Sequence, residues 1–531
     1  MPPIPDRSGP ARLAYGATAV LIGATASLGS AFVGVNLPFI QGRLGLTPVE
    51  GAWLTAAYAM TNVSGNLLFL RFRQQFGIRL FAALGLVLYA TMTLLNTLWD
   101  DYTAALVIRA LCGFATVPLS TLTIFYMLQA AGQKHSMGGL IVGLSIAQAA
   151  TPFAYVVSPA LTFSEEPHVL YLFESGLALC SLAAVALLQL PESPKARILA
   201  RGDLLTYLLV CPALALVVAV LTQGRLQWWP DHPWLAVALC AALVLMATAF
   251  VYEEVRPAPL IYHELLFAGS TMRFALGAFG LRFVLSEQTY GASGLLGLLG
   301  AGPDQLQGYY AIILMSLAAG VGVAALVFTP PRAAVLAIVA LAFMATGAFL
   351  DADATGSVRP QQFLGSQAML GFANGLFFGP ILIFGVLGAL KGGFEKLVTF
   401  IVLFIVSQTL GGLAGSALLG TIQQHREQVY SAQINASIDP TDAIVAQRLQ
   451  SQARQFAPVL TDPALQRAQG TRQLGQASTL QANVLAYNDV FRLTGALALL
   501  LLAWLSIQTL LTMIKSKEQG GTPAPAGGGA S

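Results

Sequence analysis

Residues 204–222 read LLTYLLVCPALALVVAVLT, a run of nineteen positions without a charged side chain. Crossing the roughly 30 Å hydrocarbon core of a bilayer takes about 20 mostly apolar residues in a helix. A helix also satisfies its backbone hydrogen-bonding groups internally, as the absence of water in lipid requires. This run therefore predicts a membrane-spanning helix.

Similar apolar runs occupy most of the 531-residue chain, in which 56% of residues are hydrophobic and only 10% are charged. A soluble fold could not bury so much apolar surface. We therefore expect an all-α, polytopic membrane protein. Its fourteen expected spans are residues 14–38, 50–70, 78–98, 102–127, 138–161, 168–189, 203–222, 232–252, 271–291, 305–329, 333–351, 361–385, 397–421 and 486–514.

The basic residues are distributed unevenly between the two sets of connections. Sixteen Lys and Arg residues lie in the termini and the connections on their side, whereas the short connections on the other side hold only Arg43, Arg225 and Arg359. An excess of Lys and Arg in short loops marks the cytoplasmic side of a membrane. Both termini are therefore expected to be cytoplasmic, which agrees with an even number of spans.

The spans can be divided into two halves of six with two extra spans between them, because repeated halves around a midplane site are the usual construction of transporters. The expected segments are a cytoplasmic N-terminus at 1–13, a first bundle at 14–190, two extra spans at 191–255, a second bundle at 256–514 and a disordered cytoplasmic tail at 515–531.

The connection at 422–485, on the extracytoplasmic side, is far longer than the others. Asp439-Pro440 and Asp462-Pro463 each resemble an N-cap followed by proline at the first helical position. Apolar residues then recur at helical spacing on one side of the segment after Asp439. We expect two or three short amphipathic helices; the alternative is an unstructured insertion. The recurring residues are Val445, Leu449, Ala453 and Phe456.

Several motifs resemble those of the fourteen-span drug:proton antiporters of the major facilitator superfamily, the EmrB/QacA group. The end of the first span reads VNLPFI at 35–40, followed by LG at 44–45. The second span opens with GAWL at 51–54 and has Tyr58 at the tyrosine position of that group's motif. The fourth span contains RALCG at 109–113, similar to the group's RxxqG motif.

The long connection resembles EmrB-type proteins most closely, through REQ at 426–428, SAQI at 431–434 and QAN at 481–483. The resemblance covers nearly the whole chain. It implies the major facilitator fold, proton antiport and location in the inner membrane. It also implies a periplasmic EmrA-type membrane-fusion adaptor and a TolC-type outer-membrane channel as partners.

Two motifs depart from this family pattern. The loop after the second span reads LRFRQQFGIR at 70–79, where only Gly77 and Arg79 match the motif and Gln74 occupies the aspartate position. The fifth span reads PFAYVVSP at 152–159, beginning at Pro152, instead of a segment rich in Gly-Pro and Gly-Gly. These departures favour a divergent branch of the family. We expect Gly77, Arg79, Gly113 and Pro152 to act in conformational change.

Ionisable side chains at membrane depth are costly and rare, which makes them candidates for function. The resemblance implies a role in proton coupling for Arg109; the alternative is a structural hydrogen-bonding role. Glu174 lies in an apolar run of the sixth span, where burial favours the neutral form of a carboxyl group. Glu287 and Asp489 are further candidates for proton coupling, although Asp489 fits a helix cap better.

Charged residues elsewhere support fewer predictions. Arg282 and Glu287 are five residues apart, about 140° around a helix, so we expect them not to pair. Glu253 and Glu254 end the eighth span and are expected to face solvent.

Polar and aromatic residues inside the spans are candidates for a substrate cavity. Such side chains also commonly bond or pack against neighbouring helices, which is the alternative for each of them. The candidates are Tyr58, Asn62, Asn66, Tyr126, Gln148, Tyr155, Arg282, Asn374, Phe378 and Gln408.

No motif for ATP binding, metal ligation or covalent chemistry is visible, so we expect no enzyme activity, cofactor or metal. The sequence predicts a proton-coupled exporter of hydrophobic or amphipathic compounds. One alternative is an exporter of a single endogenous lipid-like or natural-product metabolite. The other is a transporter-like scaffold or sensor that does not transport.

Overall fold

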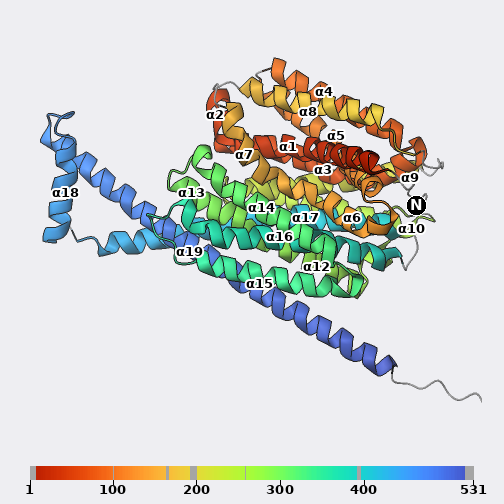
Figure 1. The fold of residues 1–531 in the computed structure, drawn as a ribbon. Helices are drawn as coiled ribbons and strands as arrows, with labels where there is room; N and C mark the ends of the chain where they lie inside the picture. Colours follow the sequence, from red (N-terminus) through yellow and green to blue (C-terminus); the bar gives the residue numbers. More distant parts are fainter. Residues whose placement is uncertain are drawn as a thin grey trace, which may run out of the picture.

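The computed structural model describes residues 8–99, 101–162, 167–191, 200–257, 259–390, 396–439 and 441–520, and these form helices joined by short connections without any strand. The N-terminal segment before Ser8 and the tail after Gly520 lie outside the described residues. The first described residues and the C-terminal end of the last helix lie at one end of the molecule, opposite the short helix α18, Ala443–Gln455 (Figure 1).

The first half of the chain forms helices that pack around α5. The helix α5 contacts α1, α3 and α4, while α8 covers α1 and α4. The fifth expected span is not one regular helix, because a 3-10 segment, Ile146–Ala149, separates α6 from α7. The bounds are α1 Gly9–Val35, α2 Leu37–Leu44, α3 Pro48–Phe76, α4 Ile78–Leu98, α5 Tyr102–Ala131, α6 Ser136–Ser145, α7 Ala150–Thr162 and α8 Pro167–Leu187.

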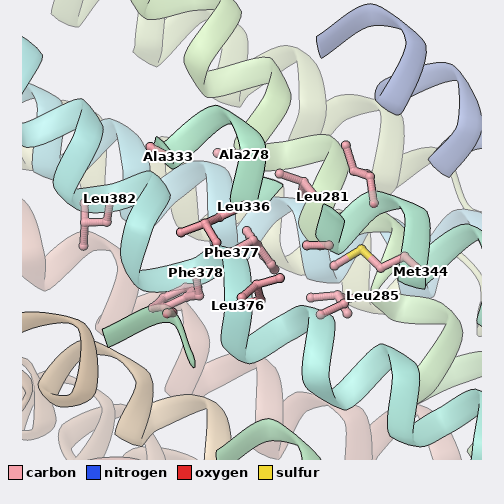
Figure 2. Close-up of a cluster of buried hydrophobic side chains, with 14 of the residues drawn as sticks. Ala278, Leu281, Leu285, Ala333, Leu336, Met344, Leu376, Phe377, Phe378 and Leu382 are labelled. Atoms are coloured by element: carbon pink, nitrogen blue, oxygen red, sulfur yellow. The ribbon is translucent and has the colours of Figure 1, made fainter. Parts of the chain in front are cut away.

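The second half packs around α16. The helix α16 contacts α14 and α15, α15 contacts α19, and α17 contacts α12 and α19. Figure 2 shows apolar side chains of this core converging from α12, α15 and α16, among them Leu281, Leu336 and Phe377. The bounds are α11 His263–Leu266, α12 Gly269–Val284, α13 Ser293–Leu298, α14 Pro303–Val327, α15 Ala333–Asp351, α16 Leu364–Leu390, α17 Lys396–Ser437, α18 Ala443–Gln455 and α19 Pro463–Gly520.

The two halves meet along two seams. At one seam α6 and α7 pack against α14, and α6 also packs against α16. At the other seam α3 contacts α17. The helix α9, Arg201–Gln223, packs on both α3 and α17, and α10, Pro233–Val255, packs on α9.

Twelve of the described helical stretches are long and apolar enough to cross a membrane. The two expected spans missing from this set are 50–70 and 271–291. The first lies in α3, where polar residues such as Asn62 and Asn66 lower the hydropathy. The second is divided, because α12 ends at Val284 and a π-helical segment, Glu287–Ala292, follows.

The long connection at 422–485 differs from the expected set of short helices. The helix α17 continues to Ser437 and α19 already begins at Pro463, so both extend beyond the apolar spans (Figure 1). Residues 422–437 contain no glycine or proline to end α17. Only α18 is a separate short helix, and it packs against α19 at the tip of the projection.

The expected details of this connection are partly confirmed. Asp462 Oδ1 accepts from Ala464 N at 2.8 Å and caps α19, as expected. The expected cap at Asp439 is wrong, because Asp442 caps α18 instead, and Pro440 lies outside the described residues. The apolar side of α18 is confirmed. Of its four residues Ala453 is buried and Val445, Leu449 and Phe456 are half-buried.

Gly375 on α16 is required by the close approach of α14. A Cβ atom at Gly375 would overlap the backbone of Leu317 and Val321, whereas one at Gly322 on α14 would meet nothing. We expect Gly375→Val to destabilise the protein by about 2 kcal/mol through overpacking, and to lower the melting temperature in detergent. Gly322→Val is the matched control, and an equal loss in both variants would contradict this packing.

Candidate functional site

A buried arginine lies at the centre of the first half. Arg109 on α5 is 3% exposed, and its Nη2 donates to the carbonyl oxygen of Gly29 on α1 at 2.9 Å. Its guanidinium carbon also lies 5.3 Å from the centre of the Tyr58 ring on α3, in cation–π geometry. Helices α1 and α3 thus both stabilise the charge of Arg109.

A buried carboxyl group faces this arginine from α8. Glu174 is 2% exposed and interacts electrostatically with Arg109, but no ion pair within 4.0 Å joins them. Within the described residues Glu174 Oε1 and Arg109 Nε have no hydrogen-bond partner. The two opposite charges are therefore near each other without being fully satisfied, in a place where unsatisfied groups are costly.

Gly29 allows these groups to approach one another. A Cβ atom at Gly29 would overlap the Tyr89 hydroxyl of α4 and lie 3.3 Å from Glu174 Oε2. Tyr89 itself is 1% exposed. The Arg109–Glu174 site, which we define as Gly29, Tyr58, Tyr89, Arg109 and Glu174, thus joins α1, α3, α4, α5 and α8.

Hydrogen bonds between α1, α3 and α5 hold the Tyr58 ring under the guanidinium. The Tyr58 hydroxyl lies 3.1 Å from the carbonyl oxygen of Ala26 and 3.0 Å from Thr116 Oγ1. Asn62 Nδ2 lies 3.1 Å from the same Thr116 oxygen and 3.3 Å from the carbonyl oxygen of Gly113. Asn66 donates to its own helix, to the carbonyl oxygen of Asn62 at 2.7 Å.

A second buried acid lies in the other half. Glu287 is fully buried at the start of the π-helical segment, and Gln367 Nε2 on α16 donates to its two carboxyl oxygens at 3.1 and 3.3 Å. The same amide donates to Asp351 Oδ2 at 2.7 Å. Sequence reasoning missed Asp351 and Gln367. Asp351 is the last residue of an apolar run, a position that suggests exposure to solvent. No sequence pattern indicates that it lies next to Glu287.

The remaining acidic candidates lie elsewhere. Asp489 is inside α19 rather than at its start, so the expected helix cap is wrong. It pairs with Arg426 of α17 at 2.5 Å and accepts from the Tyr430 hydroxyl at 2.9 Å.

Glu253 was expected to face solvent, but it is 1% exposed and pairs with Arg256 at 2.7 Å. These contacts stabilise the junctions of α17 with α19 and of α10 with the following loop.

Three candidate residues for the cavity lie where the halves meet. Arg282 on α12 donates to Gln148 Oε1 of the 3-10 segment at 3.2 Å, and does not pair with Glu287 among the described residues. The Tyr155 ring of α7 stacks on Tyr310 of α14, with ring centres 3.7 Å apart. These contacts connect the first half directly to the second.

Four other candidates lie within a single half. Gln408 Nε2 donates to the carbonyl oxygen of Ala278 at 2.9 Å, and buried Asn374 Oδ1 has no partner in the described part of the chain. Phe378 packs on Phe404 with ring centres 5.7 Å apart. The Tyr126 hydroxyl donates to the carbonyl oxygen of Leu188 at 2.6 Å, away from the Arg109–Glu174 site.

The motif residues have local structural effects. Gly77 precedes α4 with a φ of +84°, in the region that favours glycine. Arg79 Nε donates to the carbonyl oxygen of Leu190 at 2.7 Å, linking α4 to the segment after α8. A Cβ atom at Gly113 would overlap Tyr58 and Thr61 of α3, and Pro152 is buried in α7.

The family model of the Major Facilitator Superfamily matches residues 19–350, which is more than half of the chain. The chain belongs to this superfamily. The superfamily expected from the sequence motifs is thereby confirmed. No curated protein sequence matches the chain.

Solved structures of superfamily transporters share the fold. A structure from work on substrate recognition in proton-dependent oligopeptide transporters has a TM-score of 0.55 at 14% identity, covering 94% of this chain and 99% of that one. The proton:xylose symporter XylE has a TM-score of 0.55 at 13% identity, covering 92% of this chain and 95% of the other. At such low identity these likenesses concern the fold alone.

The Arg109–Glu174 site predicts a specific pattern of stability in this superfamily member. Arg109→Met leaves Glu174 buried without its opposite charge, and we expect a loss of about 3 kcal/mol. The double variant Arg109→Met/Glu174→Gln is expected to recover part of that loss, because no unpaired charge remains. Thermal melts of the wild type, both single variants and the double variant measure the coupling. Additive losses would show that the two side chains do not interact.

Proposed function

We propose that this protein is a proton-coupled secondary transporter, an antiporter that exports hydrophobic or amphipathic compounds across the inner membrane by alternating access. The observation that carries the proposal is the buried Glu174 carboxyl facing Arg109 without a direct ion pair. Superfamily membership supports transport rather than enzymatic chemistry. The EmrB/QacA-type motifs of the sequence favour antiport and a place in that group.

Proton binding at Glu174 gives a physical route to coupling. A neutral carboxyl at this position would no longer interact with the Arg109 charge, which would then depend on the Gly29 carbonyl and the Tyr58 ring alone. A ligand shifts a conformational equilibrium only if it binds the two states unequally. The Arg109–Glu174 site joins five helices of one half, so a rearrangement of that half changes the environment of the proton.

Alternating access requires the two halves to separate at one end at a time. Their described contacts include the Arg282–Gln148 hydrogen bond and the Tyr155–Tyr310 stack. We propose that α3 and α12 span the membrane with the twelve other stretches, in a 6+2+6 layout. Packing of α3 on α5 and α9, and of α12 on α17, supports this layout.

An apolar groove supports a hydrophobic or amphipathic substrate. The groove has a volume of about 180 Å³ and lies between α12, α15, α16 and α19. Gly277, Ala337 and Trp504 line its apolar part, whereas Arg273 and Gln508 are polar lining residues. A compound with an apolar body and a polar end matches such a lining.

A dedicated exporter of one endogenous lipid-like or natural-product metabolite is the second candidate. The altered loop motif at 70–79 favours it, because Gln74 stands at the aspartate position of the antiporter pattern. If the protein is such a dedicated exporter, we expect one compound to stimulate proton flux and a panel of unrelated drugs not to stimulate it.

Transport can be tested in inside-out vesicles under an imposed pH gradient. We expect the wild type to accumulate a fluorescent amphipathic dye, and Glu174→Gln to lose at least about tenfold in gradient-driven uptake because it binds no proton. Glu254→Gln, at an exposed position on α10, is the matched control and should transport normally. Equal uptake by wild type and Glu174→Gln would remove Glu174 from the coupling route. Absence of uptake of every dye and fatty acid tested would contradict broad export.

We further propose that the protein works with an EmrA-type membrane-fusion adaptor and a TolC-type outer-membrane channel. The projection formed by the ends of α17 and α19 with α18 extends far beyond the helix bundle (Figure 1). Ile444 at the start of α18 is 74% exposed and Val459 after it is 81% exposed. Exposed apolar side chains on a protruding element favour a protein contact.

Adaptor binding can be tested by pull-down from detergent extracts. Replacing residues 442–456 with a Gly/Ser linker should abolish capture of the adaptor, and Ile444→Asp/Val459→Asp should weaken it at least about tenfold. A truncation after Gly520 is the control and should bind normally. Undiminished binding by the linker variant would exclude α18 as the contact.

A further inference from the structure

Two carboxyl groups share one amide donor in the second half. Gln367 Nε2 lies 3.1 Å from Glu287 Oε1 and 2.7 Å from Asp351 Oδ2, so the two carboxyl groups lie close together against one donor. Two ionised carboxylates held this close together, away from water, would repel each other. The arrangement therefore favours a proton on one of them. We name Glu287, Asp351 and Gln367 the carboxyl pair site.

No cation compensates this site among the described residues. Each carboxyl is at most 2% exposed, and the titratable groups that interact with them are each other and Tyr309 of α14. Arg282, the nearest arginine along α12, donates to Gln148 instead. Other titratable residues on the elements packed around the site include Tyr290, Asp304, Tyr310, Arg332, His425, Arg426, Glu427, Tyr430, Tyr487, Asp489 and Arg492.

Two buried polar atoms beside the carboxyls lack partners. The Tyr309 hydroxyl is on a side chain that is 2% exposed and interacts with both carboxyls, and Gln367 Oε1 is on a fully buried side chain. Neither atom has a hydrogen-bond partner in the part of the chain that the structure describes. Unsatisfied buried polar groups are rare in closed structural networks, so their presence beside an acid pair favours a functional site.

A chain of hydrogen bonds leads from the carboxyl pair site to the seam between the halves. Gln288 Nε2 donates to the carbonyl oxygen of Gln367 at 3.2 Å, and Ser293 Oγ donates to the carbonyl oxygen of Gln288 at 2.8 Å. Ser293 Oγ also lies 2.5 Å from the Tyr310 hydroxyl. Tyr310 is the residue on which Tyr155 of α7 stacks.

The π-helical segment at Glu287–Ala292 places these groups. Single π turns inside α-helices are rare and are frequently found at functional sites. Glu287 begins this segment and Ser293 follows it directly. One local irregularity therefore places both a carboxyl of the pair and the serine that contacts Tyr310.

We propose that Glu287 and Asp351 share one exchangeable proton, which forms a second proton site and holds the contact of α7 with α14 closed on the extracytoplasmic side. Its role in transport rests on the proposed proton antiport, whereas the proton and the contact can be measured in the purified protein. Removal of the proton leaves two like charges on a single amide donor, and their repulsion moves Asp351 of α15 away from the π-helical segment. The Gln288–Ser293–Tyr310 connection then shifts and the Tyr155–Tyr310 stack loosens.

Spin labels on α7 and α14 test this directly. Cysteines at the exposed positions Ala160 and Gln305, in a protein without its four native cysteines, report the separation of α7 and α14 by pulsed electron resonance. We expect the wild-type distance to lengthen as pH rises. Glu287→Gln/Asp351→Asn cannot lose the proton and should keep the short distance at every pH. Asp353→Asn, which changes an 88% exposed acid nearby, should behave like the wild type.

Infrared spectroscopy provides a second measurement on the same proteins. The wild type should show a protonated carboxyl band that disappears on titration, and Glu287→Gln/Asp351→Asn should lack that band. A wild-type distance that does not change with pH, or a double variant that follows the wild type, overturns the proposal. A distance that responds to sodium at fixed pH instead would also overturn it, in favour of a metal cation.

The result of the distance measurement can be distinguished from the result of the dye-transport assay. Glu174→Gln should retain the pH response of the α7–α14 distance even when its uptake is lost. Normal uptake by Glu287→Gln/Asp351→Asn would overturn the role of the pair in transport and leave coupling at Glu174 intact. A pH response in a protein that transports nothing would support the pair and contradict the proposed function.

Discussion

A polar group inside the bilayer must find its partner within the protein, because no water is present to replace it. Most buried polar side chains of this chain meet that requirement by bonding across helices. Thr25 bonds to α8, Gln223 to α3, and Tyr58 to both α1 and α5. Among the described residues, buried atoms without a partner lie at Glu174 with Arg109 and beside the Glu287–Asp351 pair at Tyr309 and Gln367, and they also lie at Asn374, Gln408, Gln452 and Asn488. Buried acids beside the unpartnered atoms distinguish the first two places from the others.

The apolar runs were sufficient to predict an all-helical membrane protein, because span length and hydropathy depend only on local composition. They were not sufficient to place the ends of α17 and α19, since a helix continues beyond the membrane wherever nothing breaks it. Nor could the runs predict that α12 ends at Val284 and continues into a π-helical segment. Glu287 in that segment bonds to Gln367, and a contact between residues so far apart in the sequence leaves no local signal.

The sequence predicts those site residues whose charged side chain stands alone in an apolar run. Arg109 and Glu174 were found in this way. Asp351 was missed because it ends a span, and Gln367 because a neutral amide carries no distinctive signal. Glu253 was misread for a related reason. An acid at the end of a span can reach solvent or fold back onto backbone amides, as Glu253 does with Ile261 N at 3.0 Å, and sequence spacing does not distinguish these outcomes.

Both acid sites connect through packed neighbours to the same element, the interrupted fifth span. Glu174 lies against Gly29 of α1, and α1 packs on the 3-10 segment between α6 and α7, where Gly23 approaches Ile146. The carboxyl pair reaches the other side of this element through Tyr310 and Tyr155. A 3-10 interruption in a helix often marks a hinge, and Gln148 within it also accepts from Arg282. Proton binding at either site would therefore shift the position of the same 3-10 segment. The two distant sites would then act on one element without contacting each other.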